Sequence, residues 1–180
     1  MISSQRRRRA GTKADAPLAP IQFRLEAREE EVATAEGRCL NGRGYLICDP
    51  RTGAPLGEDD FFFRIGGGIV CDLSGAEEHL EELQSAAFRP GRSLSLVRAG
   101  DDGADDAPLI EVWDGAGATK VGALPSEVAE AVSFYGADSY EAAFCLWEWR
   151  TESGQRFALR LLLAPGWTVE QLPERDAATG

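Results

Sequence analysis

The sequence predicts a mainly β fold with two short helices. Residues 109–113 alternate apolar and polar side chains, which is the period of a half-buried strand. Residues 139–151 and 156–164 are two long strand-like runs separated by Ser153 and Gly154, which are typical turn residues. These patterns predict a sheet that contains a long β-hairpin near the C-terminal end of the chain.

The first 60 residues are expected to hold a tail and a small β element. Residues 1–20 are polar and basic and have almost no large apolar side chain, so we expect a disordered basic tail. Its four consecutive arginines, Arg6 to Arg9, are either a solvated run or a contact for nucleic acid or another polyanion. Residues 21–60 are predicted to form an N-terminal β extension that adds strands to the main domain or stands beside it.

Two strands and one irregular segment are expected within that extension. Residues 22–26 alternate like a strand, and residues 45–48 are a continuous apolar run typical of a short buried strand. Residues 28–36 are highly charged, so we expect a loop or a weak helix there.

The main domain is expected over residues 61–167, followed by a polar C-terminal tail over residues 168–180. Its first strand, residues 61–72, contains three consecutive glycines. We interpret them as a bulge or a tight bend, because no GK[ST] follows them as a phosphate-binding loop requires.

Both predicted helices lie in this domain. The first covers residues 74–87, where Ser74 is the expected N-cap and Glu77 completes a capping box. The second begins at Pro125, because the first helical position needs no N–H donor. An apolar stripe at fourfold spacing supports the second helix: Leu124, Val128 and Val132.

Three further strands are expected between the helices. Residues 93–98 form a strand that ends at an acidic turn over residues 99–108. The strand over residues 109–113 is expected to form a hairpin with residues 120–124. The turn contains Asp114 and two nearby glycines, which supply the positive φ that such turns need.

Composition and motifs exclude several classes of protein. No apolar run reaches the roughly 18–20 residues of a membrane-spanning helix, and no apolar segment follows the basic N-terminus as in a secretory signal. We therefore expect a cytoplasmic protein with no membrane partner. The four cysteines are too far apart for a zinc site and are expected to be small buried hydrophobic residues. The single histidine, His79, has no nucleophile pattern around it, so no catalytic residue is predicted. No metal and no small-molecule cofactor are expected either.

Charge is distributed unevenly along a chain whose net charge is −11. Residues 1–20 carry a net charge of +4, whereas residues 62–167 hold 8 basic and 17 acidic residues. Duplex binding through phosphate contacts normally requires a basic surface. The distribution weighs against strong nonspecific nucleic-acid binding by the folded part and leaves a local basic patch open.

Three motifs, in this order and at this spacing, resemble the HIRAN domain family. The first is the pattern G-x-x-L-x-L-V-R, which begins at Gly91 and ends at Arg98. The second is D-x-x-A-I-x-V, matched at Asp106, Ile110 and Val112. The third is V-G-x-L-P-x-E, matched at Val121, Gly122, Leu124, Pro125 and Glu127. The chain is similar to a divergent, free-standing member of the bacterial type, over residues 61–167.

The resemblance implies a small OB-like or SH3-like β-barrel with two helices. It also implies a non-enzymatic accessory domain that binds single-stranded DNA, particularly a 3′ end, in DNA repair. The residues carried over from the family as candidate nucleic-acid contacts are Arg98, Asp106 and Lys120, with Trp113 as a candidate aromatic contact. Trp147 and Trp149 are interpreted either as core residues or as a platform on which bases stack.

An alternative function follows from the departures from the family pattern. The family's Asn-Pro-x-Asp turn is replaced by residues 103–106, of which only Asp106 fits, and an aromatic residue or histidine of the third motif is replaced by Ala123. Aromatic residues that stack bases are thus missing, and acidic residues that repel phosphate are present. The alternative is a protein-interaction or scaffold module that keeps the barrel.

Overall fold

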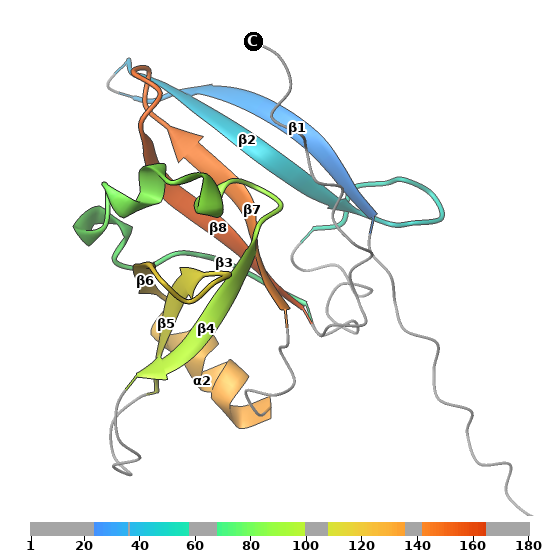
Figure 1. The fold of residues 1–180 in the computed structure, drawn as a ribbon. Helices are drawn as coiled ribbons and strands as arrows, with labels where there is room; N and C mark the ends of the chain where they lie inside the picture. Colours follow the sequence, from blue (N-terminus) through green and yellow to red (C-terminus); the bar gives the residue numbers. More distant parts are fainter. Residues whose placement is uncertain (1–23, 36, 58–67, 100–107, 136–141, 165–180) are drawn as a thin grey trace, which may run out of the picture.

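The computed structural model describes residues 24–35, 37–57, 68–99, 108–135 and 142–164, and it confirms that the protein is mainly β (Figure 1). One antiparallel sheet contains all eight described strands. Their bounds are β1 (Arg24–Ala33), β2 (Cys39–Cys48), β3 (Ile69–Asp72), β4 (Ser93–Ala99), β5 (Leu109–Asp114), β6 (Lys120–Ala123), β7 (Ala142–Arg150) and β8 (Arg156–Ala164).

The central strand of the sheet is β7. One edge of β7 pairs with β8, and β8 in turn pairs with β3. The other edge is shared, because its N-terminal part pairs with β4 and its C-terminal part pairs with β2. The order β1-β2-β7-β4-β5-β6 completes the sheet. The two hairpins expected from the sequence, β5–β6 and β7–β8, are both present.

The strand ladders leave the sheet open, so the expected closed barrel is not confirmed. The ends of β3 and β6 meet in one isolated bridge, in which Ser74 N donates to Ala123 O at 3.0 Å and Ala123 N donates to Ser74 O at 2.9 Å. Gly122 is required beside this bridge. Its φ is 151°, and a Cβ there would lie 3.0 Å from the side chain of Leu73 and closer still to Ser74 O.

The first expected helix is wrong: residues 74–87 contain three short 3₁₀ turns instead. The turns span Ala76–Glu78, Glu82–Gln84 and Ala86–Phe88. Ser74 is engaged in the bridge to Ala123 and does not cap a helix. Gly75 is left-handed at φ 73°, and Ser85 is extended at φ −57° and ψ 146°, so the backbone departs from the α conformation at both residues.

The second helix, α2 (Ser126–Tyr135), follows Pro125 as expected. It is the one α-helix among the described residues, where two were expected. Leu124 and Val132 are buried in the main core, and Val128 packs against it. The predicted apolar stripe therefore does face the sheet.

The N-terminal extension adds strands to the sheet, which is one of the two expected arrangements. β1 and β2 pair over ten residues each, and β2 continues the sheet at β7. The loop or weak helix expected over residues 28–36 is wrong, because β1 runs to Ala33. Pairing with β2 supplies the backbone hydrogen bonds of this charged segment, and such tertiary pairing overrides local preference.

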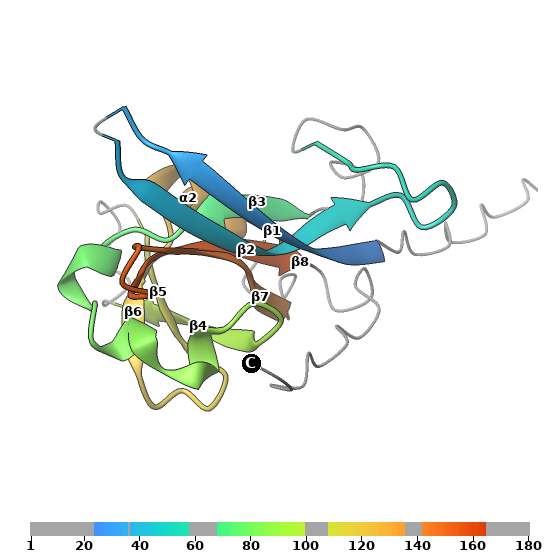
Figure 2. The same ribbon diagram turned by 90° about the horizontal axis from the view of Figure 1, so that it is seen from above.

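Apolar residues pack on both sides of the β7–β8 hairpin. The main core includes Cys145, Leu161 and Leu163, and it extends under β4, β5, β6 and α2. A second cluster on the other side contains Tyr45, Ile47, Leu146, Leu162 and Ala164. Figure 2 shows the β1–β2 hairpin on the far side of β7 and β8 from β4, β5 and β6.

All four cysteines are free thiols, and Cys48, Cys71 and Cys145 are buried as expected, whereas Cys39 is half-buried. No helix of the described part of the chain is long and apolar enough to cross a membrane. The predicted tails over residues 1–20 and 168–180 and the acidic turn that contains Asp106 lie outside the described residues.

Candidate binding site on the tryptophan side of the central strand

A bulge in β7 decides which of its side chains face the main core. Strict alternation would place Trp147 and Trp149 on the same side as Cys145, which lies in the main core. The register with β8 shifts between Cys145 and Trp147, so Leu146 is an extra residue on β7. Both tryptophans consequently lie on the side of Leu146 and the second cluster, and Glu148 turns toward the main core.

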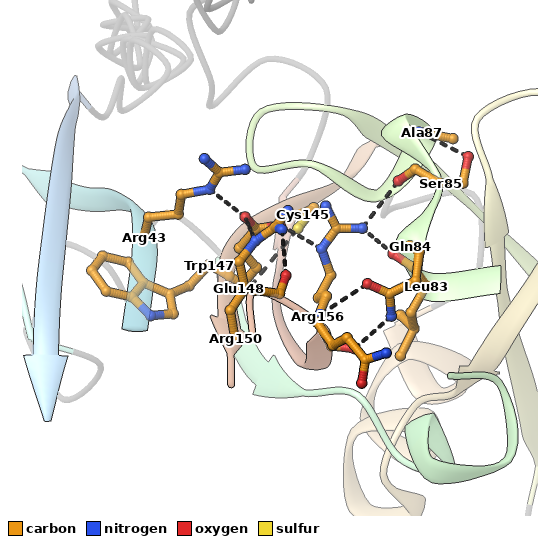
Figure 3. Close-up of polar contacts among 12 residues, drawn as sticks. Arg43, Leu83, Gln84, Ser85, Ala87, Cys145, Trp147, Glu148, Arg150 and Arg156 are labelled. Carbon is orange, nitrogen blue, oxygen red and sulfur yellow. Dashed lines mark hydrogen bonds and ion pairs between the residues drawn. The ribbon is translucent and has the colours of Figure 1, made fainter. Parts of the chain in front are cut away.

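Two glycines on β2 form the surface on which these tryptophans lie. Gly42 is opposite Trp149, and Gly44 is opposite Trp147. A Cβ on Gly42 would lie 2.6 Å from both Trp147 Nε1 and Trp149 Cζ3, and a Cβ on Gly44 would lie 2.7 Å from Trp147 Cα. The two ring centroids are 5.9 Å apart. The indole of Trp147 points away from Arg156 and lies over β2 (Figure 3).

A groove of about 440 Å³ opens beside the two indoles, and we call it the tryptophan groove. Its walls are mostly aromatic and aliphatic: Tyr45, Leu46, Ile47, Leu56, Gly57, Val70, Leu146, Trp147 and Trp149. One acid and one base, Glu30 and Arg160, complete its lining. Arg160 forms two hydrogen bonds with Asp72, at 2.8 and 3.2 Å, so its charge is compensated.

Trp147 carries an unsatisfied donor in this groove. Its side chain is buried, and its Nε1 has no hydrogen-bond partner among the described residues. A buried donor without a partner costs about 1–3 kcal/mol, so the packing of this indole on β2 carries an energetic penalty. Trp149 is only half-buried and offers part of its ring to solvent.

On the opposite side of β7, three arginines surround the carboxylate of Glu148, which is fully buried (Figure 3). Oε1 accepts hydrogen bonds from Arg43 Nε and, at 2.7 Å, from Arg150 Nε. Oε2 accepts from Arg156 Nε. We call these four residues the Glu148 cluster. It joins β2, β7 and β8 at one point.

Arg156 extends the Glu148 cluster to the 3₁₀ turns. Its side chain is only 1% exposed, and its Nη1 donates to the carbonyl oxygens of Leu83 and, at 3.0 Å, Ser85. The side-chain amide of Gln84 binds the backbone of Arg156 in both directions, at 2.8 and 2.9 Å. Arg156 thereby holds the 3₁₀ segment against the sheet.

The arginines keep Glu148 ionised. Burial alone raises the pKa of this carboxyl group, but the hydrogen bond from Arg150 and the charges of Arg156 and Arg43 outweigh burial and hold the pKa below its ordinary value. Arg43 pairs with Glu148 between the two glycine–tryptophan rows. The ion pair between Arg43 and Glu148 therefore links β2 to β7 at the position where the tryptophans lie on the opposite face.

Two of the predicted site residues are brought together on another face, at β5 and β6. Trp113 is opposite Lys120. Both bind Glu111, because Lys120 Nζ lies 2.6 Å from Glu111 Oε1 and Trp113 Nε1 lies 3.1 Å from Oε2. The hydrogen bond from Lys120, helped by that from Trp113, lowers the pKa of Glu111. The polar groups of both predicted residues are thus already engaged.

The other two predicted site residues do not join them. Arg98 is exposed and pairs with Ile110, whereas Trp113 pairs with Ser95. Ser95 and Arg98 are an odd number of residues apart on β4, so their side chains alternate to opposite faces. Arg98 therefore has the opposite facing on the sheet. Asp106 lies outside the described residues. Trp147 and Trp149 were interpreted from the sequence either as core residues or as a base-stacking platform, and both line the tryptophan groove.

Sequence reasoning missed Glu148, its three arginines and the two glycines of β2. Two signals were present in the sequence: a glutamate between two tryptophans, and an arginine at the start of an apolar strand. Charged residues in such strands are buried only when they are paired.

The described residues contain no group of three or more His, Cys, Asp or Glu residues that could hold a metal ion. Burial raises the pKa of Cys145, which disfavours the thiolate that acts as a nucleophile. No family model, curated protein or solved structure matches the chain. The fold and site define a mainly β protein with an aromatic groove, and its function must be argued from that groove.

Proposed function

We propose that the protein is a non-enzymatic interaction module that binds a segment of a protein partner in the tryptophan groove. The observation that carries this proposal is the groove itself, where two tryptophans and Tyr45 adjoin a row of aliphatic side chains. Tryptophan and tyrosine are enriched at protein interfaces and supply a large share of the binding free energy there.

The charges of the groove favour a protein segment over nucleic acid. Single strands bind in basic grooves that follow the phosphate backbone. The tryptophan groove has one acid and one base in its lining, and the base, Arg160, is paired with Asp72. A ligand of low net charge fits such a surface.

The groove is also preorganised for binding. The bulge in β7, the glycines of β2 and the Glu148 cluster fix the backbone that carries both tryptophans. Fixing the binding groups in advance lowers the entropic cost of association.

A second candidate function is the binding of single-stranded DNA, as the resemblance to the HIRAN family implies. The observation that favours it is the pair of tryptophans in one groove, because successive bases stack on aromatic rings. The order of the strands from β3 to β8 and the position of α2 are in favour of that resemblance, although 3₁₀ turns replace its first helix, and the bridge between Ser74 and Ala123 favours an OB-like arrangement. The free thiols support a reducing compartment such as the cytoplasm.

Removal of one wall of the groove separates the two candidates. Peptides would be selected from a random library against the full chain, and their affinities measured for wild type, Trp149→Ala and the matched control Trp113→Ala. We expect Trp149→Ala to weaken peptide binding about tenfold or more, which is about 1.4 kcal/mol, and Trp113→Ala to leave it unchanged.

The same three proteins would be titrated with a twelve-nucleotide single strand at low and high salt. If Trp149→Ala weakens oligonucleotide binding and no selected peptide depends on Trp149, the protein-segment proposal is overturned in favour of single-stranded DNA binding. If neither ligand depends on Trp149, the groove is not the binding site.

A further inference from the structure

One carboxylate is placed across β2 from the half-buried Trp149. Glu30 on β1 pairs with Gly42, and Gly42 pairs with Trp149 on β7. Strands in a sheet are about 4.8 Å apart, so the Cα atoms of Glu30 and Trp149 are roughly 10 Å apart. The residue between them has no side chain, and Glu30 and Trp149 line the same groove.

Glu30 is the middle of three consecutive glutamates, and the alternation of β1 separates it from its neighbours. Glu29 pairs with Arg43, whose side chain belongs to the Glu148 cluster on the other face. The thiol of Cys39 hydrogen-bonds Glu31. No residue in the described part of the chain forms a hydrogen bond or ion pair with the exposed carboxylate of Glu30.

A carboxylate that has no partner among the described residues, beside a half-buried indole, is suited to a cation. A guanidinium or ammonium group is attracted to the face of a tryptophan ring within about 6 Å of its centroid, and more strongly when the site is desolvated. The carboxylate adds an ion pair at the same position.

We propose that the tryptophan groove recognises a cationic side chain, an arginine or a lysine of the bound protein segment, between Glu30 and Trp149. The cation contacts the ring of Trp149 and pairs with Glu30, and neighbouring apolar residues of the segment fill the aliphatic part of the groove. This inference rests on the proposed function and specifies the chemistry of the partner.

The test compares two blocked hexapeptides, one with a central arginine flanked by leucines and one with citrulline in its place. Citrulline is nearly isosteric with arginine but has a neutral urea, in which a carbonyl oxygen replaces one nitrogen of the guanidinium group. Titrations followed by tryptophan fluorescence would use the full-length chain. We expect the arginine peptide to bind at least about tenfold more tightly than the citrulline peptide at low salt, and less so at high salt.

Substitution of Glu30 tests whether its carboxylate causes the difference in affinity between the two peptides. Glu30→Gln is expected to abolish the difference between the two peptides, whereas Glu29→Gln, one residue along on the other face of β1, is expected to preserve it. Both positions are exposed, so both variants are expected to fold, and equal melting temperatures would verify this.

Each other outcome overturns a defined part of the inference. Equal affinity for both peptides would rule out recognition of a cationic side chain and would leave a groove that binds apolar segments. Failure of both peptides to bind removes the proposed ligand. Tighter binding of the arginine peptide after alanine replaces Arg6, Arg7, Arg8 and Arg9 would identify the basic tail of this chain, in place of a partner, as the occupant.

Discussion

Glu148 on β7 and Glu111 on β5 are both carboxylates that bind basic side chains beside a tryptophan, but their surroundings differ. The side chain of Glu148 is fully buried and binds three arginines from three strands. The side chain of Glu111 is 17% exposed and binds one lysine from the adjacent strand. Water solvates Glu111 in part, whereas the charge of Glu148 is compensated by protein groups alone.

This difference separates a structural ion cluster from a surface ion pair. Removing one partner of a buried pair leaves an uncompensated charge in a medium of low dielectric constant, whereas water replaces a lost partner at the surface. Of these two groups of charges, the Glu148 cluster is the one that crosses from β2 to β7, so it joins the strands that carry the binding groove. The predictions below test that comparison, beginning with the largest effect.

Neutralising Glu148 is expected to be the most damaging change. In Glu148→Gln, the buried guanidinium of Arg156 loses its countercharge, and we expect the free energy of unfolding to fall by about 3–5 kcal/mol. Urea unfolding followed by tryptophan fluorescence measures this loss. The matched control is Glu130→Gln on the exposed side of α2, for which a change within about 0.5 kcal/mol is expected. Similar losses in both variants would refute the structural role of the cluster.

A methyl group on the glycine surface is expected to have the second-largest effect. In Gly44→Ala, the new Cβ would lie 2.7 Å from Trp147 Cα and closer still to the carbonyl of Leu146, so β2 must move away from β7. Such overpacking costs about 1–3 kcal/mol, measured by urea unfolding. Gly57→Ala is the control, because nothing lies within 4 Å of a Cβ at that position. An unchanged Gly44→Ala protein would mean that β2 and β7 are not in close contact.

Acid should weaken the fold partly through Glu148. Its pKa is lower in the folded protein than the ordinary value of about 4.3, so its contribution to stability is complete above that pH and is lost as the pH falls through the folded pKa. Melting temperatures between pH 3 and pH 7 would decline toward acid. The decline should be shallower in Glu148→Gln, and parallel curves for the two proteins would contradict this account.

Local patterns were sufficient to predict the hairpins and α2. The turn residues Asp114 and Gly154 and the apolar stripe after Pro125 each act within a few residues of chain, where sequence is informative. The 3₁₀ segment could not be predicted in this way, because Ser74 bonds to Ala123 on a strand almost 50 residues away. A capping pattern does not reveal that its first residue is already engaged.

The binding groove depended on longer-range information still. Strict alternation in β7 predicts that Trp147 faces the main core and that Glu148 faces away from it. The bulge reverses both orientations. A bulge is defined by the register with the neighbouring strand, which the sequence of β7 alone does not contain. The predicted contacts at Trp113 and Lys120 were chosen from family motifs, and those motifs could not indicate that Glu111 binds both side chains.

The smallest expected effect is that of Glu111→Gln, which tests the surface half of the comparison. Lys120 and Trp113 both lose a charged acceptor, but water reaches this face of the sheet, so we expect a loss of at most about 1 kcal/mol. Urea unfolding in low and high salt measures it, and salt should reduce the difference from wild type because ions screen exposed pairs. Lys120→Met should have a similar effect, and the double variant should lose less than the sum of the two, since both remove the same pair. A loss as large as that of Glu148→Gln would mean that a fully buried carboxylate with three arginine partners and a partly exposed carboxylate with one lysine partner stabilise the sheet equally, and the assignment of a structural role to burial would then fail.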